Sequence, residues 1–214
     1  FINKFNLHNN KIIFIADVHD NVPNCEILIN HLSWVTKNHY PKSKIKHFLI
    51  GSDYAILRKA FFKRKTNSKG RYLICLGSTD VSKEILKIYN SLRGIGVPEK
   101  LIDIVYDKKI PQIPFQLLHN LDSNEMFKII CDCEYAFITP GNISYEVISI
   151  NRKIIMGSVT ESQKLPLEKF EKLGLCVSVG DWSKNNFSKI ENWMIGSEKK
   201  IEAQKKFFLN LKTN

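Results

Sequence analysis

The sequence predicts an α/β fold in which a parallel sheet is flanked by helices. Three observations lead to this prediction. Short apolar runs rich in β-branched residues recur along the 214 residues. From Arg71 onward they alternate with amphipathic segments of about ten residues. Turn-forming glycine, proline and serine residues separate the two kinds of segment. Strands and helices that alternate in this way form parallel sheets joined by right-handed crossovers.

The opening part of the chain contains strands but little sign of helix. Strands are expected at residues 11–17, 26–29 and 46–50, and a loop with a helical turn at residues 31–43. We therefore expect residues 1–45 to be the tail end of an amino-terminal α/β lobe whose earlier strands are absent. Residues 46–214 are expected to form a second, Rossmann-like lobe.

The second lobe begins with a basic stretch and then becomes regular. Residues 59–69 are expected to be exposed and could link the lobes. Further strands are expected at residues 72–76, 101–106, 115–119, 135–139, 153–156 and 175–179. Helices are expected at residues 82–92, at 124–130 with Ser123 as N-cap, directly behind Gly141, at 165–173 and at 198–211.

Composition and charge narrow the class of protein. The chain is 43% hydrophobic and 25% charged, which is typical of a soluble globular protein, and no apolar run is long enough to span a bilayer. The net charge of +11 suits an anionic partner. We do not expect nucleic acid, because no RNA-binding motif, zinc spacing or basic heptad region accompanies the charge.

The five cysteines favour free thiols in a reducing cytoplasm. Cys131 and Cys133 form a C-x-C pair without a second cluster, so no metal site or other cofactor is expected. No signal peptide is recognisable, and the first residue, Phe1, suggests a fragment of a longer protein.

One strand–turn–helix stretch is the first candidate binding site. The strand at 135–139 stops at Pro140 and Gly141, and a helical pattern starts at once behind them. A helix start exposes backbone N–H groups and can hold a phosphate. Glu146, one turn further, could accept hydrogen bonds from a sugar hydroxyl. The simpler alternative is an ordinary turn with Asn142 as N-cap and Glu146 as a solvated acid.

A second turn of the same kind strengthens the nucleotide hypothesis. Gly77, Ser78 and Thr79 follow another predicted strand and offer small residues with open N–H groups. Ligands of parallel sheets bind outside the carboxyl ends of the strands. Two such turns at one edge therefore predict a ligand that carries phosphate.

Five motifs occur in order from about Ile15 to Gly180. The most specific is Gly51-Ser52-Asp53-Tyr54-Ala55-Ile56-Leu57-Arg58, which is similar to G-x-x-Y-A-L-L-R. The segment from Ile15-Ala16-Asp17 to Asn30 is similar to I-D-D-L…C-D-L-L-L-N, Leu76 to Asp80 to a G-G-x-D turn, Ile138 to Glu146 to I-S-x-x-x-x-x-x-E, and Ser162-Gln163 to an N-Q pair. In this order the motifs resemble those of the UDP-diacetamido-trideoxy-altropyranose hydrolases of the pseudaminic acid pathway and their relatives in spore-coat polysaccharide synthesis.

The resemblance implies a fold, an activity and a set of contacts. The family has a GT-B-like fold of two Rossmann-type lobes, and this chain would be its carboxyl-terminal, UDP-binding lobe with a remnant of the other. In that family water displaces UDP from the sugar, and no cofactor is expected here. The resemblance assigns nucleotide binding to Gly77, Ser78, Thr79, Gly141, Asn142, Glu146 and Gln163, with Glu146 on the ribose, and substrate binding to Asp17, Tyr54 and Arg58.

Departures from the family pattern limit the expected activity. The G-x-G-H motif, whose histidine is thought to activate water, does not occur. His19 and His119 are the substitutes near predicted strand ends, and neither is assigned as the base. Because hydrolysis needs a positioned base, the fragment is expected to be inactive alone. Ala16, Ser78, Pro140 and Asn142 also differ from the family's residues.

Two alternatives stay open. The chain could be the donor-binding lobe of a GT-B glycosyltransferase, which uses a sugar hydroxyl or lipid carrier in place of water. It could also be a non-catalytic lobe appended to a sialic-acid-type enzyme such as a cytidylyltransferase. The expected partners are therefore UDP or a UDP-sugar, together with the absent amino-terminal lobe or a fused enzyme domain.

Overall fold

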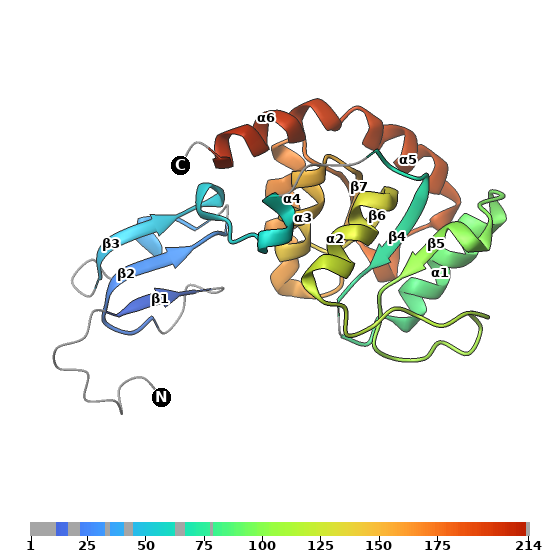
Figure 1. The fold of residues 1–214 in the computed structure, drawn as a ribbon, viewed down its shortest axis with the longest axis horizontal. Coiled ribbons are helices and arrows are strands. Elements are labelled where there is room, and N and C mark those ends of the chain that lie inside the picture. Colours follow the sequence, from blue (N-terminus) through green and yellow to red (C-terminus); the bar gives the residue numbers. More distant parts are fainter. Residues whose placement is uncertain are drawn as a thin grey trace. The chain divides into compact units, whose positions relative to one another are not determined.

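The computed structural model describes residues 12–16, 22–32, 35–40, 45–62, 67–77 and 79–212 (Figure 1). The chain divides into two units, each with its own parallel sheet. The first unit comprises the chain up to Ile56 together with the carboxyl-terminal residues from Leu209 onward. The second unit is Leu57–Phe208. This division differs from the predicted boundary after residue 45, which would separate Ile45 from the rest of its own strand.

The first unit contains a three-stranded parallel sheet. Its strands are β1 (Ile13–Ile15), β2 (Cys25–Asn30) and β3 (Ile45–Ile50), hydrogen-bonded in that order. Leu28 in the middle strand is fully buried in a core that Val35, Tyr40 and Ile45 complete. The expected loop between β2 and β3 contains the short 3-10 helix Lys37–His39, in agreement with the predicted helical turn.

The second unit contains the larger sheet. Its five parallel strands lie in the order β5 (Ile102–Ile104), β4 (Arg71–Cys75), β6 (Cys133–Ile138), β7 (Lys153–Ser158) and β8 (Val177–Asp181). The strands read as almost continuous apolar runs because helices cover both faces of the sheet. The predicted α/β fold with Rossmann-like parallel sheets is confirmed.

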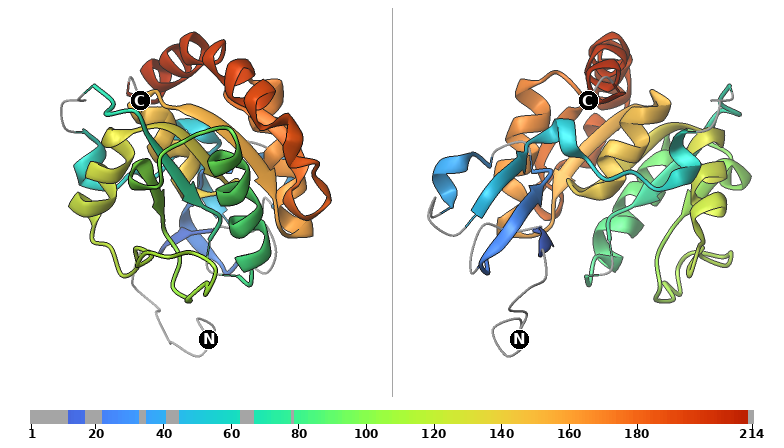
Figure 2. Two further views of the ribbon diagram at one scale, coloured as in Figure 1. Left: turned by 90° about the vertical axis from the view of Figure 1, so that its right-hand side faces the viewer. Right: turned by 60° about the vertical axis from the view of Figure 1, so that its left-hand side comes forward.

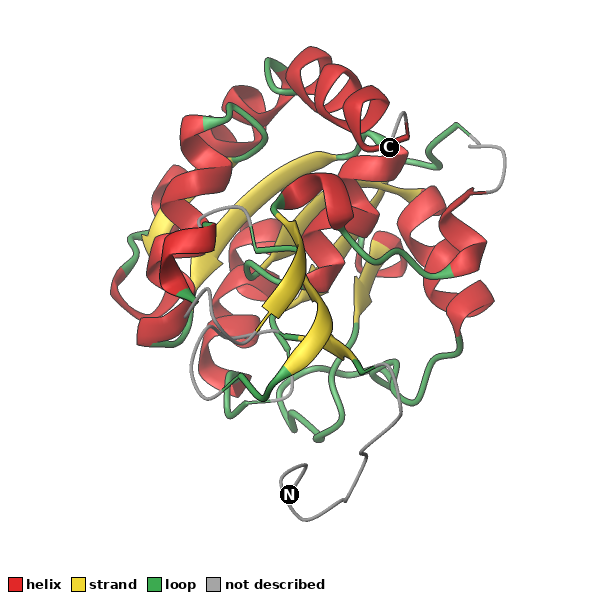
Figure 3. Cartoon of the chain, turned by 90° about the vertical axis from the view of Figure 1, so that its left-hand side faces the viewer, coloured by secondary structure: helices red, strands yellow, loops and turns green. Residues whose placement is uncertain are grey.

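Helices connect these strands and cover the two faces (Figures 2 and 3). They are α1 (Ser82–Gly94), α2 (Ser123–Asp132), α3 (Asn142–Ile150), α4 (Lys164–Lys172), α5 (Ile190–Glu198) and α6 (Ile201–Lys212). Helices α1 and α5 share one core with Ile74 and Phe137 of the sheet. Helices α2 and α3 pack together, and α3 contacts α4 through Tyr145 and Phe170. One face therefore carries α1 and α5, and the other α2, α3 and α4.

The strand order reverses between β4 and β6. The chain leaves β4 for β5 at the edge, returns to the other side of β4 with β6, and continues to β8. A single parallel bridge joins Val105 to Leu118 outside β5. With that bridge counted as a rudimentary strand, the order is the 3-2-1-4-5-6 of dinucleotide-binding folds.

The predicted strand at residues 115–119 is wrong, because only this bridge forms there. Leu118 donates to the carbonyl of Ile104 and accepts from Tyr106, at 2.8 and 2.9 Å. Pro114 has no N–H to donate, and Asn120 turns the chain with φ of 52°. The turn at Asn120 ends the pairing directly after Leu118, and the described residues before Leu118 form no further bridge.

Three further expectations need correction. The N-cap of α2 is Asp122 rather than Ser123, because its carboxylate accepts from the backbone N–H of Asn124 and Glu125. The helix expected at residues 198–211 forms as α6, which begins at Ile201, whereas the separate helix α5 before it was not predicted. The stretch expected to be an exposed linker contains a 3-10 helix, Lys59–Phe62, in which Ala60 and Phe61 are buried. Phe61 packs edge-on against Phe127 of α2.

Candidate functional site

The two predicted turns lie side by side at the point where the strand order reverses. Strands β4 and β6 are paired, with Cys75 opposite Ile138. The residues after each strand also touch, because the Thr139 hydroxyl donates to the Leu76 carbonyl at 3.4 Å. Open α/β sheets bind ligands in the crevice outside the strand ends at such a reversal. Pairing of β4 with β6 thus builds the candidate site.

The Ser144 hydroxyl stabilises the turn after β6 through two hydrogen bonds. The Gly141 N–H donates to the Ser144 hydroxyl at 3.2 Å, and that hydroxyl donates to the Thr139 carbonyl at 3.2 Å. Gly141, not Asn142, is therefore the N-cap of α3. Both residues are exposed. First-turn N–H groups have no acceptor within their own helix, and the helix dipole adds positive potential there, so this end of α3 can hold an anion.

Both turn glycines leave open space. An added Cβ would meet no atom within 4 Å at Gly77 or at Gly141. Gly77 has φ of 94°, a left-handed conformation that favours glycine. Gly141 has φ of 165°, which is extended and open to any residue. The fold therefore needs glycine at position 77, whereas at position 141 the absence of a side chain only leaves the backbone uncovered.

Glu146 is buried and paired, not solvated. Its side chain is 7% exposed and forms a bidentate ion pair with Arg58, whose side chain is 40% exposed. Arg58 Nε donates to Oε1 at 2.6 Å and Nη2 donates to Oε2 at 2.8 Å. These charge-assisted hydrogen bonds hold the carboxylate in place, and they raise the pKa of Arg58. The simpler alternative of a solvated first-turn acid is therefore wrong.

Cys75 connects this ion pair with the β4 turn. Its sulfur interacts with the Gly77 backbone and with the charges of Glu146 and Arg58. Burial raises the pKa of its thiol to about 11. The thiol therefore stays protonated at neutral pH and acts as a small apolar group between the two halves of the site.

Other predicted site residues have different placements. Gln163 accepts a hydrogen bond from the Val159 backbone at 2.8 Å, so its side chain closes the turn after β7. Thr79 is exposed beside Gly77. Tyr54 belongs to the first unit, in the 3-10 helix Ser52–Tyr54. Ser78 and Asp17, like His19, lie outside the described residues. The contacts expected of Tyr54, Ser78 and Asp17 stay predictions.

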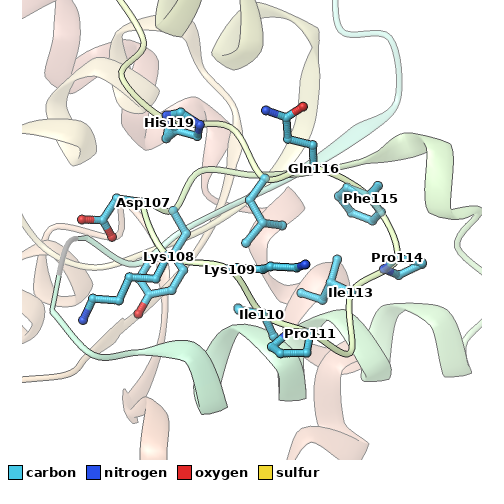
Figure 4. A pocket seen from close by; sticks show the side chains of 12 residues that line it. Asp107, Lys108, Lys109, Ile110, Pro111, Ile113, Pro114, Phe115, Gln116 and His119 are labelled. Atoms are coloured by element: carbon cyan, nitrogen blue, oxygen red, sulfur yellow. The ribbon is translucent and has the colours of Figure 1, made fainter.

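A pocket of about 570 Å³ lies in the loop after β5, at the same edge of the sheet (Figure 4). Tyr106 joins it to the β4 turn, because its hydroxyl donates to the Thr79 carbonyl at 3.4 Å. Buried Ile110, Ile113 and Leu117 form the apolar lining. Lys109 and exposed His119 supply polar groups. Its apolar lining and polar rim are typical of a small-molecule site.

Sequence reasoning missed two residues that shape the site. Ser144 could have been found from its spacing, because a hydroxyl three residues after an N-cap can reach back to the cap's N–H. Trp182 could not, because it follows β8 and reaches β6 only in the folded chain. Its indole N–H donates to the carbonyl of Ile138, the last residue of β6, at 3.3 Å.

Neither metal ligands nor a membrane helix were found in the part of the chain that the structure describes. Its histidine, cysteine and acidic side chains form no group of three or more that could hold a metal ion. None of its helices has both the length and the apolar character needed to cross a bilayer.

Comparison with known proteins gives a structural likeness only. No protein-family model and no curated protein matches the sequence. A glycosyltransferase of kitacinnamycin is similar, with a TM-score of 0.60 and 11% identity over 88% of this chain and 51% of that one. So is the spinosyn rhamnosyltransferase SpnG complexed with thymidine diphosphate, with a TM-score of 0.56 and 10% identity over 89% and 54%.

A third neighbour is a putative UDP-N-acetylglucosamine 2-epimerase from Listeria monocytogenes, with a TM-score of 0.52 and 10% identity over 84% of this chain and 53% of that one. This chain spans about half the length of the solved structures it matches. At such low identity, the likeness supports the α/β Rossmann-like fold and no particular activity.

Proposed function

We propose that the second unit is a nucleotide-sugar-binding lobe that takes UDP or a UDP-sugar. The observation that carries the proposal is the meeting of two open glycine turns, after β4 and β6, at the reversal of strand order. The amino end of α3 lies at one of them and the buried Glu146 one turn behind it. Backbone donors suit a diphosphate, whereas a carboxylate suits neutral hydroxyls and repels phosphate.

The pocket after β5 supports a ligand with a nucleoside part. Its link to the β4 turn through Tyr106 lets one ligand contact both places. In the proposed arrangement the diphosphate lies against Gly77 and the start of α3, the ribose hydroxyls donate to Glu146, and the base extends toward the pocket. Gln163, Tyr54 and Asp17 stay candidate contacts to the sugar.

For the whole enzyme we propose a GT-B-like protein that releases UDP from a diacetamido-trideoxy sugar in nonulosonic acid or related glycan synthesis. This finer proposal rests on the five ordered sequence motifs. A GT-B glycosyltransferase is the second candidate, and it is compatible with the fold that this chain shares with the solved glycosyltransferases. His119 is exposed and lines the pocket, but among the residues that the structure describes no hydrogen-bond partner was found that would orient it as a base.

Calorimetric titration tests nucleotide binding. We expect saturable binding of UDP, weaker binding of CMP and ADP, and a loss of about tenfold or more in UDP affinity in Glu146→Ala, since hydrogen bonds to a charged group contribute about 1.5–3 kcal/mol. Asp103→Ala is the matched control. Asp103 also pairs with an arginine in bidentate fashion, but that arginine, Arg71, begins β4 at the opposite end. Absence of UDP binding would contradict the proposal.

Product analysis separates the two enzyme classes. The chain is incubated with UDP-N-acetyl sugars, with and without sugar or lipid-phosphate acceptors, alone and with the amino-terminal lobe of a related hydrolase. Free sugar formed without acceptor supports the hydrolase. Release of UDP only when an acceptor is present supports the transferase. Stable oligomers that bind no nucleotide would instead support the non-catalytic lobe.

A further inference from the structure

The ion pair between Arg58 and Glu146 occupies the groups that a ribose would need. A carboxylate offers about four lone-pair sites on two oxygens. Arg58 takes one on each oxygen, through Nε at 2.6 Å and Nη2 at 2.8 Å. A vicinal diol that chelates a carboxylate uses this same edge, with one hydroxyl to each oxygen. The guanidinium and the diol therefore compete for Glu146.

The two partners differ in how far they can move. Glu146 is 7% exposed and is held within α3, whereas Arg58 is 40% exposed on a long flexible side chain. Removing Arg58 without a substitute would leave a buried carboxylate and a free guanidinium, which is costly. A diphosphate at the neighbouring turns gives the guanidinium a new partner, since guanidinium forms bidentate hydrogen bonds with phosphate as well as with carboxylate.

We infer that Arg58 makes recognition of the ribose depend on the phosphate. In the free chain Arg58 caps Glu146. When a nucleoside diphosphate binds, the diol takes the carboxylate edge and Arg58 moves to a phosphate oxygen. Arg58 pairs with a residue of α3, the helix whose amino end is the proposed phosphate position, so both partners of Arg58 lie at the same helix. A nucleoside without phosphate has to break the ion pair with no new partner for Arg58, and it binds poorly. Arg58 is thus a specificity-determining residue of the proposed UDP site, on which this inference rests.

The test compares uridine with UDP in two variants, Arg58→Gln and Arg58→Lys. Lysine cannot form the bidentate pair but keeps a cation beside Glu146, so this variant folds even if the glutamine variant does not. We expect uridine to bind about tenfold more tightly to both variants than to the wild type, which corresponds to about 1.4 kcal/mol. UDP binding weakens in Arg58→Gln.

Arg71→Gln is the control, because it breaks another bidentate arginine pair, which joins Arg71 of β4 to Asp103 of β5. It should leave both affinities unchanged. Unchanged or weaker uridine binding in both Arg58 variants, with UDP still bound by the wild type, would overturn the inference. It would show that Arg58 stays on Glu146 as a fixed support. If the wild type binds no UDP, the proposed function itself fails and the inference with it.

Discussion

Gly141 and Glu146 show how the chain separates the needs of folding from those of binding. Gly141 is neither strained nor crowded, so its missing side chain serves no purpose in the fold. Glu146 is a buried carboxylate that forms an ion pair with a half-exposed arginine. Buried charges are expensive and are usually found where they have a role. Gly141 is the N-cap of α3 and Glu146 lies within that helix, which starts beside the β4 turn.

Gly141→Ala tests the separation of folding from binding. The extended φ accommodates alanine, so we expect the free energy of unfolding to change by less than about 0.5 kcal/mol. UDP affinity should fall about tenfold, because a methyl group at the start of α3 keeps a phosphate away from the N–H groups. Denaturant unfolding and calorimetry measure the two effects.

Gly94→Ala is the control for this prediction. Gly94 ends α1, and an added Cβ there also meets no atom within 4 Å. Gly94→Ala should not show the tenfold loss of UDP affinity that is expected of Gly141→Ala. Equal UDP binding by wild type and Gly141→Ala would contradict the role given to the uncovered backbone.

At the scale of elements, strand β8 helps to position the turn after β6. Trp182 follows β8, is fully buried, and donates to the last carbonyl of β6. It fits there because β7 has glycine at position 157. A Cβ on Gly157 would lie 2.8 Å from both Trp182 and Val179. Strands β6, β7 and β8 thus together determine the position of the turn at Gly141.

Gly157→Ala should therefore affect both stability and binding. Overpacking of this kind costs about 1–3 kcal/mol, and a displaced Trp182 releases the Ile138 carbonyl. We expect a lower urea midpoint, a red-shifted tryptophan fluorescence spectrum and weaker UDP binding. Wild-type stability in this variant would show that Trp182 is not held as tightly as the distances indicate.

The N-cap of α2 gives a second test at this scale. Asp122 and Glu125 form a reciprocal capping box, in which Asp122 Oδ1 accepts at 2.7 and 2.9 Å and Glu125 accepts from the Asp122 N–H at 2.8 Å. Asp122→Ala should cost about 1 kcal/mol of stability. Ser123→Ala should cost much less, and a reversed order of the two losses would restore Ser123 as the cap.

The sequence alone predicts the helices and strands whose apolar residues recur with a clear period. It does not predict the features that tertiary contacts determine. The strand and turn at residues 71–77 and the helix behind Gly141 follow from local pattern alone. The strand at 115–119 is reduced to the bridge at Leu118, which the turn at Asn120 ends. Burial of Glu146 could not be predicted, because Arg58 lies 88 residues away in the chain. Local pattern thus located the turns, and long-range contacts determined what surrounds them.

At the scale of the whole molecule, buried thiols tie stability to pH. Burial raises the pKa of Cys75 to about 11 and that of Cys133 and Cys176 to about 12. In the unfolded chain a thiol has a pKa near 8.5. Above that pH the unfolded state has lost protons that the folded state keeps. Stability is therefore fully present below about pH 8.5 and falls as the pH rises toward 11–12.

We expect the free energy of unfolding to fall by about 1.4 kcal/mol per pH unit for each such thiol above its unfolded pKa. Urea titrations at pH 7, 9 and 10, under reducing conditions, measure the decline. Cys176→Ala should show a shallower decline, because one of the three thiols is gone. A midpoint that is constant from pH 7 to 10 would contradict burial of these thiols in the folded chain.

The central claim is that the turns after β4 and β6 bind one diphosphate together. Backbone amide NMR of the chain during titration with UDP tests it most directly. We predict the largest shift changes at Gly77, Thr79, Asn142 and Ile143, saturating at one UDP per chain, and little change at Lys100 and Asp132 near the other end of the sheet. Changes at only one of the two turns, or mainly at the opposite end, would contradict a shared phosphate site at the reversal of strand order.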